Sequence, residues 1–365
     1  MLPFDENRYV PVLFTKRSEL NAVGDLPSSI KDAMTPVFVV HPQEVDFDSG
    51  GLKKSMHAHV EKLPKALVDA WGTGGAFIDL VNLSDEPMSD GSHPLVWLLR
   101  ECATLGLDLT PVVSPDRSTN YLASVVSLLA GATSQVAFRL TANQWPGSTG
   151  PASVDALLRT LGLQASDVHV LLDIEGEAGN TAYSALSAEL RLMPTIQQWT
   201  SLTVVGSSRP APANLPGKGI HEMERVEWTT YKRIRNGLPP RIPSFGDYGI
   251  AAIETVSVDP RVMSIAGKIT YTVEDISLFA KGELFKGQAG SGIGGDSVVE
   301  PCRLVSLHRL FLGRGHCLFE GWIEDVANRS VAGSSPGTWL RHGTHHHLIH
   351  SVEQIASLPS ASTSP

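Results

Sequence analysis

The chain has 365 residues, of which 42% are hydrophobic and 18% are charged, and its formal net charge is −9. This length suits one large barrel with an appendix, or two domains. The negative charge argues against broad nucleic-acid binding, although it leaves room for a local basic patch. No stretch of the sequence is long and apolar enough to cross a bilayer, so no membrane association is expected.

Eight apolar, strand-like runs follow one another along the chain, most of them separated by stretches of helical length. They are Tyr9–Thr15, Thr35–Val40, Ala76–Val81, Leu107–Val113, Ser134–Leu140, Val168–Ile174, Ser201–Gly206 and Tyr248–Ile253. Alternating strand and helix patterns predict a parallel sheet with helices outside it. Eight such units predict an α/β fold, a closed (β/α)8 TIM-like barrel, whose functional sites lie at the C-terminal ends of the strands.

The pattern changes after the eighth run. Lys268–Thr272 and Ser277–Lys281 predict a β-hairpin, and helices are expected over Val298–Phe311 and Leu348–Leu358. A further helix is expected over His221–Arg235, before the last barrel strand. We therefore expect a barrel over residues 8–256, a C-terminal hairpin and helical extension packed on it over 257–358, and a disordered tail over 359–365.

The cysteines and the N-terminal residues indicate in which cellular compartment the protein is expected. Three scattered cysteines, Cys102, Cys302 and Cys317, are too few for a disulfide framework and favour a reducing environment. The opening MLPFDENRYV lacks a basic start followed by an apolar run, so no signal peptide is predicted. The expected location is therefore cytoplasmic.

Polar and charged side chains stand at or near the ends of the predicted barrel strands. In a barrel such residues converge on one mouth. Carboxylates beside Arg and Lys can bind a sugar or a phosphate, and a shifted carboxyl pKa permits acid–base catalysis. The candidate catalytic residues are Glu19, Asp79, Asp173 and Glu175, and the candidate ligand-binding residues are Lys16, Arg17, Arg139, Ser207, Asp247 and Tyr248.

Two other interpretations of these charges stay open. Charges inside a barrel need partners whether or not there is catalysis, so the residues also fit a structural salt-bridge network, with Asp173 and Arg139 as its main pair. Alternatively, Asp79 and Glu175 are two acids that could flank a glycosidic bond.

The segment His345-His346-His347, with His350 after it, has the most unusual composition in the chain. We expect Thr338–His350 to return to the barrel mouth, where His345 or His346 could serve as a catalytic base. If the segment is helical, His346 and His350 lie one turn apart and could ligate a metal, although no H-E-x-x-H or Cys-containing set accompanies them. The alternative is that one histidine forms a hydrogen bond while the others are solvated. The sequence identifies no cofactor.

Several blocks resemble one known family. Tyr9-Val10-Pro11-Val12-Leu13, followed by Lys16-Arg17 and Glu19, is similar to the opening of the phage and bacterial beta protein family. The later blocks agree, namely Gly246-Asp247-Tyr248, Ile269-Thr270-Tyr271-Thr272, Thr338-Trp339 and Gly343-Thr344-His345-His346. The resemblance covers nearly the whole chain. It implies a link to phages and phage–host conflict, sometimes beside a nuclease-like partner, and it implies no established reaction.

Two functional hypotheses follow, and whether the chain is an enzyme stays open between them. The first is a scaffold or effector-associated component of a phage-defence or phage–host conflict system, which binds a protein partner and a small ligand at the barrel mouth. The second is a TIM-barrel enzyme, a hydrolase or lyase acting on a phosphorylated or sugar-containing small molecule or nucleotide. The acidic net charge and the lack of a catalytic motif favour the first, and the charged mouth favours the second.

Overall fold

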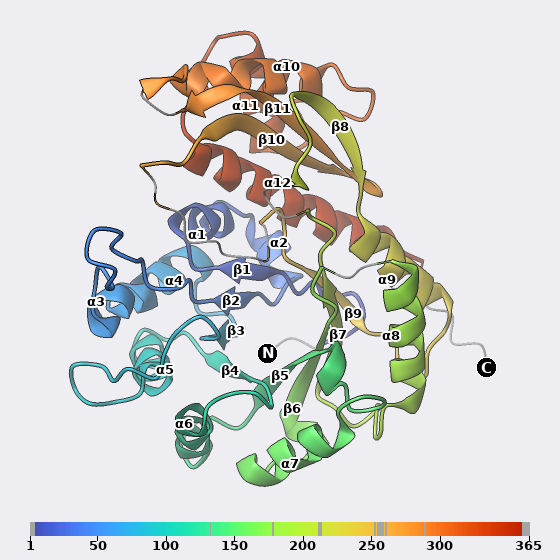
Figure 1. Cartoon of the computed structure of the whole chain (residues 1–365). Coiled ribbons are helices and arrows are strands. Elements are labelled where there is room, and N and C mark those ends of the chain that lie inside the picture. Colours follow the sequence, from blue (N-terminus) through green and yellow to red (C-terminus); the bar gives the residue numbers. More distant parts are fainter. Residues whose placement is uncertain are drawn as a thin grey trace.

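A parallel sheet closed into a barrel forms the larger part of the molecule (Figure 1). The computed structural model describes residues 4–131, 133–176, 179–210, 214–251, 253, 259, 261–287 and 290–359. Its strands, in their order around the sheet, are β1 (Val12–Phe14), β2 (Val37–Val39), β3 (Ala76–Asp79), β4 (Leu109–Val113), β5 (Val136–Thr141), β6 (Val168–Asp173), β7 (Ser201–Gly206) and β9 (Ser244–Asp247). A parallel bridge between Tyr9 and Phe245 joins the last strand to the first, so the predicted (β/α)8 barrel is confirmed.

Helices cover the outside of the barrel, as the alternating pattern predicts (Figure 1). They are α1 (Arg17–Gly24), α2 (Ser28–Asp32), α3 (Met56–Val60), α4 (Leu63–Trp71), α5 (Pro94–Thr104), α6 (Thr119–Leu129), α7 (Pro151–Leu161), α8 (Asn180–Leu192) and α9 (Val226–Asn236). A large buried cluster, which includes Phe38, Ile78, Phe138 and Leu172, fills the layer between these helices and the strands.

Side chains alternate between the barrel interior and this outer layer, because successive residues of a strand point to opposite faces. Phe77, Ala137 and Leu171 belong to the interior cluster. Two residues further along each of these strands, towards its C-terminal end, come Asp79, Arg139 and Asp173. The strand period therefore places these three charged side chains inside the barrel at its mouth.

A three-stranded antiparallel sheet lies beside the barrel, in the order β10-β11-β8. Its strands are β8 (Gly219–Glu224), β10 (Ile265–Val273) and β11 (Ile276–Lys286), and α10 (Val299–Ser306) and α11 (Leu318–Ala327) pack with it. This sheet has its own core, in which Tyr271, Phe319 and Trp339 are buried. The long helix α12 (Pro336–Ser357) runs between the barrel and this sheet (Figure 1).

Four expected boundaries were wrong, although the predicted hairpin is confirmed as β10 and β11. The last barrel strand is Ser244–Asp247 rather than Tyr248–Ile253, and Val298–Phe311 becomes α10, which ends at Ser306. His221–Arg235 is divided into strand β8 and helix α9, because residues 219–224 pair with β11. The closing helix begins at Pro336 rather than near Leu348.

Glycine explains the position of the closing barrel strand. A Cβ atom on Gly246 would lie 2.6 Å from the carbonyl oxygen of Val10, so only glycine lets β9 approach β1 this closely.

The boundary expected at residues 256–257 and nearly all of the tail, residues 360–365, lie outside the described residues. The division into a barrel and an extension stays a prediction, and β8 belongs to the second sheet although it precedes that boundary.

Candidate functional site

An arginine–aspartate network occupies the barrel mouth. Arg139 extends from β5 and donates to Asp79 on β3 at 2.9 Å and to Asp173 on β6 at 2.8 Å. Arg117, from the loop after β4, also donates to Asp79. Tyr248 donates its phenol proton to Asp173 at 2.5 Å and accepts a hydrogen bond from Arg139. The structure therefore brings together the ends of five strands, β3, β4, β5, β6 and β9, through one network.

Each aspartate in this network is fully buried and fully engaged. Besides the arginines, Asp79 accepts from the backbone N–H of Val81 at 2.9 Å, and Asp173 accepts from the backbone N–H of Glu175 at 2.8 Å. Both aspartates are 0% exposed. A buried carboxylate with several donors is held in one orientation, and its oxygens are occupied by protein groups. These contacts favour a positioning role for Asp79 and Asp173 over proton transfer.

A cavity of about 260 Å³ opens above the network. Polar lining residues outside the network include Asn82, Asp116, Thr141 and Gln144. Arg117 also lines the cavity, and its Nε is buried without a hydrogen-bond partner among the described residues. The guanidinium of Arg117 also lies over the ring of Tyr121, with Cζ 5.0 Å from the ring centroid, so a fixed positive charge stands at the cavity wall and favours a ligand with an oxygen acceptor.

Glu175 lines the same cavity in a strained backbone conformation. Its φ is +50°, in the left-handed region that residues with a side chain seldom adopt. Its carbonyl oxygen accepts the backbone N–H of Ser207 at 2.8 Å, which ties the end of β6 to the end of β7. Strain of this kind persists where surrounding structure enforces it, and it concentrates at functional sites.

Three of the predicted residues lie near the end of β1 rather than inside the mouth. Lys16 and Arg17 line a separate groove outside the barrel. Glu19 is 2% exposed, and its Oε1 accepts the backbone N–H of Phe14 at 3.2 Å. Its Oε2 has no hydrogen-bond partner among the described residues, and burial raises the pKa of Glu19 to about 7. A carboxyl group in this range can exchange protons near neutral pH.

Asp247 points out of the barrel, contrary to the expected convergence of the strand-end charges. It follows Phe245 by two residues and faces the outer layer with it. There it accepts from Tyr9 Oη at 2.7 Å and from His347 Nε2 of α12 at 3.0 Å. Burial alone would raise the pKa of Asp247, but His347 and Arg225 outweigh it and lower the pKa to about 2. Ser207 and Asp247 line a small cavity of about 20 Å³ at this junction.

His347, rather than His345 or His346, makes the contact between α12 and the end of a barrel strand, at Asp247 of β9. Its other nitrogen, Nδ1, lies 2.8 Å from Thr272 Oγ1 on β10. This one side chain therefore joins the barrel to the second sheet. The segment does return to the barrel as expected, but a different histidine of the run faces the strand-end charge, because the helix turns each neighbour to another side.

His346 and His345 face in two further directions. His346 Nδ1 lies 2.8 Å from Glu320 Oε1, and its Nε2 lies 2.7 Å from the carbonyl oxygen of Thr272, so both nitrogens face acceptors. Burial alone would raise the pKa of Glu320, but the contact with His346 lowers it to about 2. His345 is buried beside Asp25 at the end of α1. In the described structure, neither histidine reaches the network at the barrel mouth.

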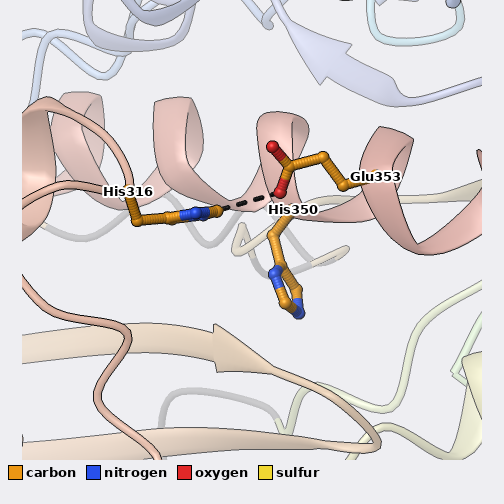
Figure 2. Close-up of side chains that lie close together, drawn as sticks. All are labelled: His316, His350 and Glu353. Atoms are coloured by element: carbon orange, nitrogen blue, oxygen red, sulfur yellow. Dashed lines mark ion pairs between the residues drawn. The ribbon is translucent and has the colours of Figure 1, made fainter. Parts of the chain in front are cut away.

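His316, His350 and Glu353 lie close enough together to be candidate metal ligands (Figure 2). One ligand atom from each lies within 4.8 Å of the others, and His316 Nε2 is 3.8 Å from Glu353 Oε2. However, His350 Nε2 accepts the backbone N–H of Glu274 at 3.1 Å, which leaves its proton on Nδ1. A metal bound to Nδ1 would displace that proton to Nε2, where it would face the N–H of Glu274. The hydrogen bond between Glu274 and His350 therefore opposes metal ligation.

His346 fits a metal less well, since both of its nitrogens are engaged by acceptors. The hydrogen bonds of His346 and His350 favour structural roles for both, and their role as metal ligands stays a prediction.

Sequence reasoning missed two residues that complete these networks. Arg117 lies in Ser114-Pro115-Asp116-Arg117, directly after β4, and its place at a strand end could have identified it. Arg225 is buried between Glu227, at 3.6 Å, and Asp247, at 3.9 Å, and nothing in its local sequence signals this. Its partners come from the first turn of α9 and from the closing barrel strand.

These features define an α/β barrel protein with a polar, internally paired mouth and a second sheet attached through a long helix. The chain belongs to the beta protein family, since the family model described as Beta protein matches residues 9–353. The resemblance noted in the sequence is therefore confirmed over nearly the whole chain.

Comparisons with curated proteins and with solved structures do not identify a function. No curated protein matches the sequence. Among solved structures, the spore cortex-lytic enzyme SleL of Bacillus megaterium QM B1551 is similar at 10% identity, with a TM-score of 0.33, over 94% of this chain and 75% of that chain. A likeness at this level supports no conclusion about the function of the present chain. None of the helices in the described part of the chain combines the length and apolar character that crossing a membrane requires.

Proposed function

We propose that this chain is a binding component of a phage-defence or phage–host conflict system, which holds a small polar ligand at the barrel mouth and acts with a protein partner. The phage context rests on what membership of the beta protein family implies, and a nuclease-like protein is the partner class that the family suggests. A cytoplasmic location stays a prediction.

One observation carries the proposal of binding rather than catalysis. Asp79 and Asp173, the two acids inside the mouth, are each saturated by charged or polar donors. A catalytic carboxyl must contact the reacting group, and these protein contacts already occupy the oxygens of both aspartates. The same contacts fix the arginines in place, which suits a preorganised binding surface.

The cavity limits the size and chemistry of the ligand. Its volume of about 260 Å³ fits a small metabolite rather than a polymer. The guanidinium of Arg117 at the wall favours an oxygen acceptor, and the amides of Asn82 and Gln144 add further polar groups to the wall. A sugar-containing or phosphorylated small molecule meets these requirements.

Filling the cavity tests the proposal. Val81 lines the mouth and is 49% exposed, so Val81→Trp is expected to occupy the cavity while leaving the core intact. Native mass spectrometry of the full chain should show a bound small molecule in the parent protein and loss of most of it in Val81→Trp. Val126→Trp, at a residue 41% exposed on α6, is the matched control and should retain the ligand. Equal occupancy in Val81→Trp and Val126→Trp would contradict the proposal.

A second candidate function is an enzyme, a hydrolase or lyase acting on the same class of small molecule. The strained backbone of Glu175 at the cavity wall favours it. A ligand released from the purified protein should be returned to it in excess and followed by mass spectrometry. An unchanged mass supports the binding component. Conversion over many turnovers, lost in Glu175→Gln, supports the enzyme.

A further inference from the structure

We infer that a groove outside the barrel, at the C-terminal ends of β1 and β2, binds a phosphorylated organic molecule. This groove is distinct from the mouth cavity, and the two have no lining residue in common. The inference goes beyond the proposed function and does not depend on it.

Elements from four parts of the chain form the groove. Thr15 and Lys16 follow β1, His41 follows β2, and the helices α1 and α4 form the two long walls. Arg341, from the first half of α12, completes the lining. The groove has a volume of about 1150 Å³, enough for an organic molecule of nucleotide size.

The acids that line the groove are neutralised by partners. Asp25 pairs with Arg341 through both carboxylate oxygens, at 2.6 and 2.7 Å. Glu44 pairs with Lys53 at 3.0 Å, and Asp69 pairs with Lys65 at 2.9 Å. Each acidic side chain of the lining therefore has a cationic partner within the protein.

Three cations that line the groove have no such partner. Lys16, Arg17 and Lys62 are exposed and form no ion pair within the described part of the chain. Lys16 instead lies with Nζ 5.2 Å from the ring centroid of Phe14. The chain has a net charge of −9, but three cations without an ion-pair partner make this groove locally positive. Such a cluster attracts an anion, and Arg with Lys is a suitable set for a phosphate.

The rest of the lining suits the organic part of such a ligand. Leu20, Leu63 and Ala66 give apolar surface beside the cations. The rings of His41 and His59 lie 4.7 Å apart at the same end, and burial lowers the pKa of His41 to about 4, so its ring is neutral at pH 7. Cations beside apolar and aromatic surface fit a phosphate on a flat or apolar body better than inorganic phosphate alone.

The test compares AMP, adenosine and inorganic phosphate by isothermal titration with the full chain. AMP is expected to bind at least tenfold more tightly than either of the other two, and its affinity is expected to fall as salt is raised. The double variant Arg17→Glu, Lys62→Glu is expected to weaken AMP binding at least tenfold. Arg159→Glu, an exposed cation on α7 away from the groove, is the matched control and should leave the affinity unchanged.

Thermal unfolding of each variant confirms that the fold is retained, which the exposure of both residues leads us to expect. The absence of AMP binding, or equal weakening by Arg159→Glu, would overturn the inference. Val81→Trp separates the two sites, because it fills the mouth and should leave AMP binding in the groove intact. Loss of AMP binding in Val81→Trp would assign the phosphate to the mouth and also overturn the inference.

Discussion

Replacing Asp173 with alanine is expected to lower the free energy of unfolding by about 3–5 kcal/mol. The substitution leaves the partly buried Arg139 with Asp79 as its remaining carboxylate, and it removes the acceptor of the buried Tyr248 phenol proton. Burial of an unpaired charge or donor is the physical source of the loss. The measurement is the denaturant midpoint of Asp173→Ala against the parent chain.

The control for this prediction is Asp155→Ala, at an exposed carboxylate on α7, which should change the free energy of unfolding by less than about 0.5 kcal/mol. Asp173→Asn adds a second comparison, since it keeps the shape and removes the charge. If Asp173→Ala unfolds at the same midpoint as the parent chain, the network is not a stabilising element and the account of the mouth is wrong.

Replacing Glu19 with glutamine is expected to make the protein less sensitive to rising pH. Burial raises the pKa of Glu19 to about 7 in the folded chain, against 4.5 as its ordinary value. Below pH 4.5 the carboxyl is protonated in both states, and its contribution to stability is fully present. As the pH rises from 4.5 to 7, the unfolded chain ionises first, so the folded state loses about 3 kcal/mol that is not regained above pH 7.

The test is the difference in the free energy of unfolding between Glu19→Gln and the parent, measured at pH 4 and pH 8. The advantage of Glu19→Gln should grow by about 3 kcal/mol between these pH values, because glutamine keeps the acceptor for the Phe14 N–H and does not ionise. Glu61→Gln, at an exposed carboxyl, should show no such trend. A constant difference for Glu19→Gln would show that the carboxyl ionises normally in the folded protein.

The barrel could be predicted from the sequence because its signals are local. A buried parallel strand reads as a short apolar run, as in Val168–Asp173 and Ser201–Gly206, and the helices between the runs are long enough to cross the sheet. The period of two then predicts that Asp79, Arg139 and Asp173 point inward. The Asp173–Arg139 pair is observed as expected, at 2.8 Å.

The remaining features depend on contacts between distant segments. Residues 219–224 form β8 because β11, more than fifty residues later, offers them an edge, and no local pattern shows this. The histidines of α12 are buried because Glu320, Thr272 and Asp247 meet them from three other elements. The grouping of Lys16 and Arg17 with Lys62, rather than with the mouth, likewise depends on how α1 and α4 pack.

A crystal structure of the full chain, purified from cells without added ligand, tests the central claim most directly. We expect electron density for a small oxygen-rich molecule in the cavity lined by Asn82 and Gln144, with one of its oxygens within hydrogen-bond distance of the Arg117 guanidinium. A mouth that holds only solvent would contradict this claim.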